Sequence, residues 1–319
     1  MSRSKKFFKE YAVFITLIVF SIILSCVSPH FLTPQNITNV LRQTSMVIIV
    51  GVAVNLLMFT GNIDLSVGSQ IALVGVVMAK FVDHNKPFPL WAAILIAFVV
   101  GVVCGLINGL LSVRLNISGL IITLGTMYLF RGAAYILSES KTITVGLPPL
   151  YNLFGQGYIW IIPLPVIVFI ILIFIFLYLQ NFTRLGLYSY SIGSNLQASK
   201  LSGVPVKRVL IILYTLIGIC CGLTGVIQSS RTVSAGPTTA LGFEFDVIIA
   251  ILLGGTAISG GSGNIRGMVF GALVLGVLRN AMNLLGLPNY WRYITTGAIF
   301  ILAIILNKSL RGETLREEV

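Results

Sequence analysis

Residues 158–180 read YIWIIPLPVIVFIILIFIFLYLQ, a long apolar run without Asp, Glu, Lys or Arg. A helix that crosses a bilayer core about 30 Å thick needs about 20 mainly apolar residues. This stretch meets that requirement, so it predicts a membrane-spanning helix.

The whole chain has the same character as this stretch. Of its 319 residues, 56% are hydrophobic and only 9% are charged, and its mean hydropathy is +0.99. A soluble domain carries about 25% charged residues. The composition therefore predicts an all-α polytopic membrane protein with one transmembrane domain over residues 1–319, for which lipid is a partner.

The excess of basic residues and the cysteines have ordinary explanations in a membrane protein. A net charge of +12 would suggest nucleic acid in a soluble chain. Here Lys and Arg are expected on cytoplasmic loops, where they orient the spans and meet anionic lipid, so no nucleic-acid partner is predicted. The four cysteines lie in apolar runs without metal-ligand spacing, which favours small buried side chains over disulfides or a metal site.

Windows of suitable length and hydropathy predict about ten spans. Two of them, the third and the eighth, adjoin Gly-rich polar segments. An even number places both termini on one side, and with the N-terminus inside, more than half of the 21 basic residues fall on cytoplasmic segments. The prediction is therefore cytoplasmic termini and spans at 11–28, 45–60, 66–83, 89–112, 120–138, 158–180, 208–229, 244–259, 265–286 and 291–307.

Glycines at four-residue spacing suggest an internal repeat. The spacing of Gly101, Gly105 and Gly109 recurs at Gly263, Gly267 and Gly271, five spans later. A duplicated unit at that distance would run in the opposite direction, as in transporters built from inverted repeats. Close packing of helices in lipid explains the same glycines equally well.

A polar segment, GNIDLSVG at 61–68, interrupts the apolar sequence between the second and third windows. A carboxylate such as Asp64 is costly in a bilayer unless it faces protein or water. One interpretation is a broken helix that opens into a cavity, with Asn62, Asp64 and Ser66 at a translocation pathway or gate. The other is a tight turn in which Asp64 or Ser66 caps the next helix. Both remain open.

Further polar residues lie near the outer ends of later windows. Glu244 and Asp246 are candidates for a pathway or gate role and could form a salt bridge to a partner; the alternative is that they simply cap the helix that follows. Asn280 and Asn283 precede Tyr290, Trp291 and Arg292. Aromatic residues there are typical interface anchors, although amides and rings also suit a neutral hydroxylated solute. We include both asparagines among the pathway candidates.

No motif indicates catalysis or nucleotide binding. The glycine-rich run LGGTAISGGSGNIRG at 253–267 has neither the GxxxxGK[ST] pattern nor Rossmann spacing. Nor does the chain contain GxSxG or HExxH. We expect a non-enzyme that binds no cofactor or metal itself.

The stretch IGSNLQASKLSGVPVKR at 192–208 is polar and basic, and it separates two long apolar runs. Ser194 or Asn195 is a candidate N-cap, residues 196–201 make two short turns, and Gly203 ends them before Pro205. This pattern predicts a short cytoplasmic helix within 192–204. A rigid helix of this kind can transmit motion from a partner protein.

The motif GSN at 193–195, followed by ASKLSGV at 198–204, resembles the cytoplasmic segment of permease subunits of bacterial ABC importers for monosaccharides. Other ordered motifs extend the resemblance over nearly the whole chain: FLTPQN at 31–36, QTS at 43–45, NIDLSVGS at 62–69, TRLG at 183–186, LGGT at 253–256 and NLLG at 283–286. Two departures stand out. Asn62 replaces a glycine that is usual in the family, and Leu196 and Gln197 stand where an acid is common.

The resemblance implies an ATP-driven importer of a ribose-like monosaccharide in the bacterial inner membrane. A separate cytoplasmic ABC ATPase would use ATP and Mg, and an extracytoplasmic binding protein would deliver the sugar. A second permease copy or a paralogue would complete the pathway. The resemblance assigns contact with the ATPase to Gly193, Asn195, Ala198, Leu201, Ser202 and Gly203.

Two other classes compete with this interpretation. An ion-coupled secondary carrier of a small hydroxylated solute would need titratable groups inside its spans. Asp64, with Arg131 or Arg279 as countercharge, is its candidate. A membrane scaffold or polymer flippase explains the spans but not the segment at 192–204.

Overall fold

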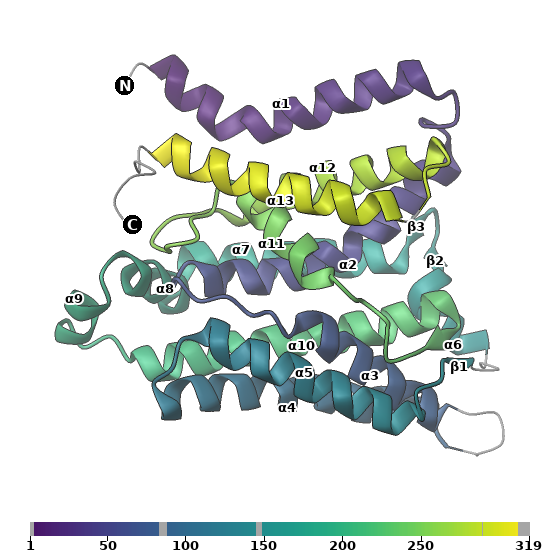
Figure 1. Cartoon of the computed structure of the whole chain (residues 1–319), viewed down its shortest axis with the longest axis horizontal. Helices are drawn as coiled ribbons and strands as arrows, with labels where there is room; N and C mark the ends of the chain where they lie inside the picture. The colour runs from purple at the N-terminus through teal and green to yellow at the C-terminus, as the bar shows by residue number, and fades with distance from the viewer. Residues whose placement is uncertain (1–2, 83–87, 145–148, 289, 312–319) are drawn as a thin grey trace.

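The computed structural model describes residues 3–82, 88–144, 149–288 and 290–311 (Figure 1). Within these residues the chain is almost entirely helical, with four two-residue strands. The helices are α1 (Arg3–Val27), α2 (Pro34–Met58), α3 (Val67–Phe81), α4 (Leu90–Leu115), α5 (Gly119–Ser138), α6 (Pro149–Gln156), α7 (Leu164–Phe182), α8 (Arg184–Ser194), α9 (Leu196–Leu201), α10 (Val206–Thr232), α11 (Phe243–Leu253), α12 (Ile265–Leu284) and α13 (Tyr290–Arg311).

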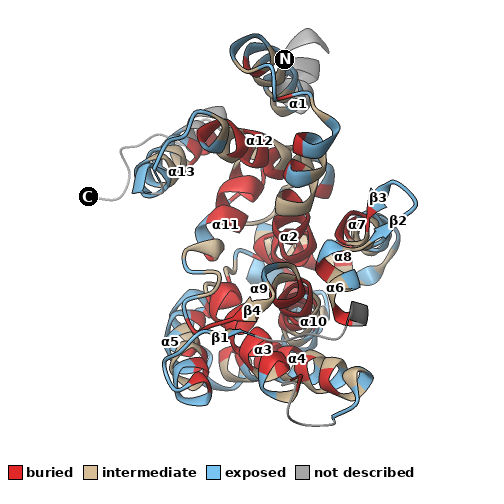
Figure 2. Cartoon of the chain, turned by 90° about the vertical axis from the view of Figure 1, so that its right-hand side faces the viewer, coloured by how far each residue is buried: buried red, intermediate tan, exposed pale blue. Residues whose placement is uncertain are grey.

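Helix α2 is the core of the fold. It begins where Thr33 accepts a hydrogen bond from the Asn36 backbone, with Pro34 as its first residue, a position that proline favours. Its interior, VIIVGVAVNLLM at 47–58, is apolar on nearly all sides, and such a helix is buried. Its apolar window is 83% buried, compared with 22% for α7, so α2 is central and α7 peripheral (Figure 2).

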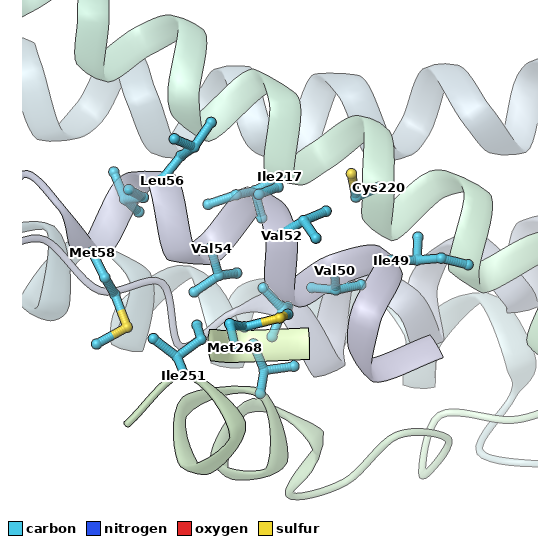
Figure 3. Packing of buried hydrophobic residues seen from close by; sticks show 14 of the residues in the cluster. Ile49, Val50, Val52, Val54, Leu56, Met58, Ile217, Cys220, Ile251 and Met268 are labelled. Atoms are coloured by element: carbon cyan, nitrogen blue, oxygen red, sulfur yellow. The ribbon is translucent and has the colours of Figure 1, made fainter. Parts of the chain in front are cut away.

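The side chains around α2 come from helices far apart in the sequence. Figure 3 shows Val50, Val52 and Val54 of α2 with Ile217 of α10 and Met268 of α12. Helices α7, α10, α11 and α12 all contact α2. Helix α2 is thus the axis of the largest hydrophobic cluster. A second cluster joins α3, α4, α5, α6 and part of α10, and a third joins α1 to α2 and α12.

Glycines bring α4 and α10 into direct contact. A Cβ on Gly101 would lie 2.6 Å from the Gly218 backbone oxygen, and one on Gly222 would lie 3.2 Å from the Phe98 backbone oxygen. Small residues allow the two backbones to approach closely. In lipid no hydrophobic force drives helices together, so close van der Waals packing of this kind stabilises their association. In the later repeat, Gly267 and Gly271 pack against Gly254 and Ala250, while Gly263 lies in the loop before α12.

The structure is that of a polytopic membrane protein, although not every window holds a full span. Six helices are long and apolar enough to cross a bilayer, namely α2, α4, α5, α7, α10 and α12. Three further apolar segments are shorter, at 13–27, 67–81 and 290–305. The number of ten spans and the inverted repeat remain predictions.

The eighth window contains a half-length helix. Helix α11 has 11 residues, about 16 Å at 1.5 Å per residue, which is too short to cross alone. It ends at Gly254, and Gly255 adopts a φ of +84°, which favours glycine. The predicted extension to residue 259 is therefore wrong.

The opening stretch starts as a hairpin rather than as a helix. Strand β2 (Tyr158–Ile159) pairs with β3 (Ile162–Pro163), and α7 begins only at Leu164. Prolines at 163 and 165 suit a helix start, since the first turn needs no backbone donor. A second small pair, β1 (Ile143–Thr144) with β4 (Ser234–Ala235), joins the loop after α5 to the end of α10.

Different helices lie at the two ends of the molecule. Helices α8 and α9 lie at the left end in Figure 1, where α1 begins and α13 ends. Helix α10 starts there and runs to the opposite end, near α6. Its 27 residues correspond to about 40 Å.

Candidate functional site: a polar cavity and a cytoplasmic junction

A cavity of about 670 Å³ opens at the end of α10 away from α9. Helices α2, α10, α12 and α13 and the loop before α11 supply most of its wall, and Ile71 of α3, Phe243 of α11 and the loop after α12 complete it. This volume lies in the range of small-molecule sites, about 300–1,000 Å³. Its polar lining consists of Gln43, Thr44, Gln228, Thr224, Arg231, Thr232, Thr238, Arg279, Asn283, Arg292 and Tyr293, and we call it the polar cavity.

One face of α10 presents a polar stripe to the polar cavity. Thr224, Gln228, Arg231 and Thr232 are separated by four, three and one residues, which places them on one side of the helix. On α12, Leu275, Arg279 and Asn283 follow the same four-residue spacing on the opposing wall. Two helices thus face each other with polar and charged groups.

An ion-pair network lies beside the polar cavity. Asp246, which is 1% exposed, pairs with Arg279 of α12 and lies 3.4 Å from the Arg292 guanidinium of α13. Asp246 also belongs to the first turn of α11. Both interpretations from the sequence therefore hold for this residue, a salt bridge and an acidic helix start.

Glu244 lies in a different environment from Asp246. Its side chain is buried, and a Cβ on Gly68 of α3 would lie 2.6 Å from its Oε2 atom. Within the described residues this oxygen has no hydrogen-bond partner. Glu244 thus marks where the start of α11 touches the start of α3, and it does not line the polar cavity.

The predicted cluster at 61–68 forms a saturated network elsewhere. Asp64 Oδ1 accepts hydrogen bonds from the Ser66 backbone at 2.8 Å and the Ser66 hydroxyl at 2.6 Å. Asn108 of α4 donates to Ser66 Oγ at 2.8 Å, and Thr126 of α5 donates to Asn108 at 2.6 Å. Asp64 thereby orders the turn before α3, whose N-cap residue, Ser66, makes no side-chain cap hydrogen bond. The network joins α3, α4 and α5.

The countercharges suggested for Asp64 are wrong. Among the described residues, Arg279 pairs with Asp246. Arg131 donates to the backbone oxygens of Pro237 and Thr239 at 2.6 and 2.7 Å. Asp64 is 1% exposed and has hydroxyl and amide partners instead.

The remaining pathway candidates lie in different parts of the structure. Asn280 forms a reciprocal amide pair with Asn36 of α2, at 2.9 and 2.6 Å, so it fastens α12 to the start of α2. Asn62 donates to Thr60 within its own loop. Of the seven candidates, Asn283 lies on the wall of the polar cavity, and Asp246 reaches that wall through Arg279.

At the other end, α9 has the predicted boundaries. Asn195 Oδ1 accepts from the Ala198 backbone at 2.9 Å, which makes it the N-cap. Gly203 has a φ of +78°, with Gly203 N bonded to Lys200 O and Val204 N bonded to Ser199 O. This pair of bonds is the Schellman arrangement that ends helices at glycine. Asn195, Ala198, Leu201, Ser202 and Gly203 are exposed, and Leu201 is 89% exposed.

Gly193 is instead packed in a junction with two other segments. A side chain there would collide with the backbone of Phe59 and Gly261. The Phe59 ring stacks on Tyr190 at 4.4 Å, and the Tyr190 hydroxyl donates to Gly263 O at 2.8 Å. Gly261 N also donates to Phe59 O at 2.9 Å. We call these five residues the Phe59 junction, since they join α8, the end of α2 and the loop before α12.

The polar cavity contains residues that the sequence did not single out. Thr224 and Gln228 fall inside the apolar window 208–229 as span residues, and Gln43 and Thr44 precede the window 45–60 in the QTS motif, with no pathway role predicted for them. The signal that would have found two of them is the pair of polar residues four apart in the window 208–229. No group of three or more metal-ligating residues occurs among the described residues.

Comparison with known proteins covers nearly the whole chain. Ribose import permease protein RbsC of Escherichia coli K12 is 36% identical over 307 residues, 95% of each chain. The D-allose transport system permease protein AlsC of the same organism is 33% identical over 95% of this chain and 92% of its own length. The corresponding galactose/methyl galactoside permease MglC is 35% identical over 94% of each.

No solved structure matches the chain. The family described as the permease component of the branched-chain amino acid transport system matches residues 36–304, from the start of α2 almost to the end of α13. With that match, and with relatives above 30% identity along its length, the chain belongs to this family of transport permeases.

Proposed function

We propose that this chain is the transmembrane permease subunit of an ATP-driven ABC importer that moves a monosaccharide into the cytoplasm. The observation that carries the proposal is the identity of 33–36% to permeases named for ribose, allose and galactose, over more than 90% of the chain. The sugar is ribose-like in size. Which of these sugars it is depends on the binding protein that delivers it.

The polar cavity supports a transport role. Its wall offers hydroxyl, amide and guanidinium groups, which hydrogen-bond to a hydroxylated solute, and its volume is sufficient for one. The chain performs no covalent chemistry in this proposal. ATP and Mg belong to the ATPase partner.

The exposed side of α9 supports contact with that ATPase. Its ends are fixed by the Asn195 cap and the Gly203 turn, so it moves as a unit. The Phe59 junction then connects its neighbour α8 to the central helix. In this proposal the α9 end is cytoplasmic, as are both termini, and the polar cavity faces the binding protein.

The proposed assembly contains two permease chains, either two copies or this chain and a paralogue. Lipid covers the peripheral apolar side chains. Phe174, Ile175 and Leu129 are largely exposed and belong to membrane-length helices. Ten spans and an inverted repeat are part of the proposal.

Co-purification tests the coupling assignment. Proline at Gly203 requires a negative φ and removes a backbone donor, so Gly203→Pro disrupts the end of α9. Gly286→Pro is a matched control. Gly286 also has positive φ (+66°) and donates to a helix-terminal carbonyl, at the far end of the molecule. We expect the ATPase to co-purify with wild type and Gly286→Pro and to be lost with Gly203→Pro. Retention in all three would contradict the assignment.

The ion-coupled carrier is the competing function. It predicts that the purified chain alone accumulates solute in proteoliposomes under an ion gradient. The importer predicts uptake only with the ATPase, the binding protein and ATP. Uptake by the chain alone would overturn the proposal.

A further inference from the structure

Two side-chain oxygens in the wall of the polar cavity have no hydrogen-bond partner within the part of the chain that the structure describes. They are Oγ1 of Thr224 and Oε1 of Gln228, one turn apart on α10. Thr224 is 1% exposed. Buried polar atoms without partners are rare in folded proteins, and each one needs an explanation such as a ligand or ordered water.

Other threonines in these helices donate a hydrogen bond to a carbonyl of their own helix. Thr215 and Thr232 of α10 donate to the carbonyls four residues earlier, Ile211 O at 2.8 Å and Gln228 O at 3.0 Å. Thr44 of α2 does the same with Val40 O. This back-bond is the usual way for a threonine to satisfy its hydroxyl within a helix. Thr224 makes no such bond among the described residues and instead adjoins the polar cavity.

The opposing wall complements these oxygens. On that wall, Arg279 presents a guanidinium, which donates and cannot accept a hydrogen bond, and Asn283 presents an amide; Arg231 adds a second guanidinium from the α10 side. Gln228 Oε1 is a pure acceptor, and the Thr224 hydroxyl is both donor and acceptor. A sugar hydroxyl also donates and accepts, so a polyol between the two walls can use both kinds of group.

We propose that Thr224 and Gln228 form a subsite that binds hydroxyl groups of a neutral monosaccharide in the polar cavity. The proposal rests on the function proposed above and identifies where along the path the sugar makes direct contact. Gln228 accepts a hydrogen bond from one hydroxyl. Thr224, one turn deeper along α10, bonds to a neighbouring one.

The experiment uses the full complex in proteoliposomes, containing the permease, its ATPase and saturating binding protein. The solutes are D-ribose, D-allose or D-galactose, whichever the wild type takes up, and the monodeoxy analogues of that sugar. The variants are Thr224→Val and Gln228→Leu, which remove the polar atoms with little change in volume. Thr215→Val is the matched control, because it makes the same change on the same helix at a residue that is not part of the cavity wall.

We expect uptake of the parent sugar to fall about three- to tenfold in Thr224→Val and Gln228→Leu, as for one lost hydrogen bond. Uptake should be unchanged in Thr215→Val. For one deoxy analogue, the wild type should already be slow, and Thr224→Val should be no slower. In Thr224→Val, the ratio of parent-sugar uptake to analogue uptake then approaches one. Thr224→Ser, which keeps the hydroxyl, should restore the wild-type ratio and guards against a folding defect.

Equal ratios for Thr224→Val, Gln228→Leu and Thr215→Val would overturn the subsite. A loss in Thr224→Val that Thr224→Ser does not restore would also overturn it, because the defect would then be one of packing. Failure of the proposed function looks different. In that case the wild-type complex itself shows no ATP-dependent uptake of any of the three sugars.

Discussion

Two buried aspartates show that burial alone does not identify a functional carboxylate. Asp64 and Asp246 are each 1% exposed. Asp64 bonds to hydroxyl and amide groups that fix the start of α3, whereas Asp246 holds two guanidinium groups from α12 and α13. The first role is local, and the second joins three helices beside the polar cavity.

The Asp246 network gives a stability prediction. In Asp246→Asn, the Arg279 guanidinium remains mostly buried without its carboxylate, since its side chain is 17% exposed. Removing one partner of a buried ion pair typically costs about 3 kcal/mol or more. We expect a clear fall in the melting temperature of the protein purified in detergent.

A double-mutant cycle separates the ion pair from general damage. Asp246→Asn with Arg279→Gln leaves no unpaired charge between the two positions, so the double variant should lose less stability than the two single losses together. Strictly additive losses of stability would mean that Asp246 and Arg279 stabilise the fold independently of each other.

At the scale of elements, the Phe59 junction links α8, the neighbour of α9, to the central helix α2. The Tyr190 hydroxyl, the Phe59 ring and the close backbone approach of Gly193 leave α8 little freedom to move without α2. At the same end of the molecule, Asn55 of α2 accepts from the Thr256 hydroxyl, and Asn307 of α13 donates to Thr256 O, both at 2.8 Å. The glycine-rich loop is therefore bonded on both sides.

Tyr190→Phe tests whether this link carries motion. The change deletes the bond to Gly263 O and keeps the ring on Phe59. We expect the complex to retain its ATPase rate but to move less sugar per ATP. A change of about 0.5–2 kcal/mol in the coupling free energy corresponds to roughly a two- to thirtyfold loss of sugar moved per ATP hydrolysed. The assay is the ratio of sugar uptake to ATP hydrolysis in proteoliposomes.

Tyr188→Phe is the control, because the Tyr188 hydroxyl makes no hydrogen bond among the described residues, although the residue lies only two positions away on α8. An unchanged ratio in both variants would exclude the Tyr190 bond as a coupling contact. A parallel fall in uptake and ATPase rate would indicate loss of assembly instead.

The elements that the sequence predicted well are those set by local chemistry. Asn195 and Gly203 fix α9 through their own backbone preferences, and a long apolar run fixes α4. The short α6 and the early end of α11 were missed. Their lengths depend on glycines and prolines inside apolar sequence, and the ends of helices are the least certain part of any pattern.

At the scale of the whole molecule, the polar cavity was beyond sequence reasoning because its lining residues come from six helices and two loops. Thr224 and Thr215 look alike in the sequence, yet one faces the polar cavity and the other bonds to its own helix. Asn280 and Asn283 were equivalent candidates, and only their positions on α12 separate them. Contacts across the bundle decide these roles, and no local pattern encodes them.

The arrangement of the whole molecule also predicts its orientation. Leu201 of α9 and Thr232 at the far end of α10 are both exposed, and the 27 residues of α10, about 40 Å, separate them. In the proposed orientation Leu201 is cytoplasmic and Thr232 lies at the extracytoplasmic mouth of the polar cavity. The starting chain for labelling carries Cys26→Ala, because Cys26 is exposed while Cys104, Cys220 and Cys221 are buried.

In that chain, a membrane-impermeant maleimide added to intact spheroplasts should label Thr232→Cys at once. It should label Leu201→Cys only after the membrane is opened. The unmodified starting chain should remain unlabelled throughout, since its three cysteines lie among packed helices. Labelling of Leu201→Cys in intact spheroplasts would invert the orientation and remove α9 from the reach of any cytoplasmic ATPase. Labelling of both positions from one side would contradict the placement of α10 as a full membrane span.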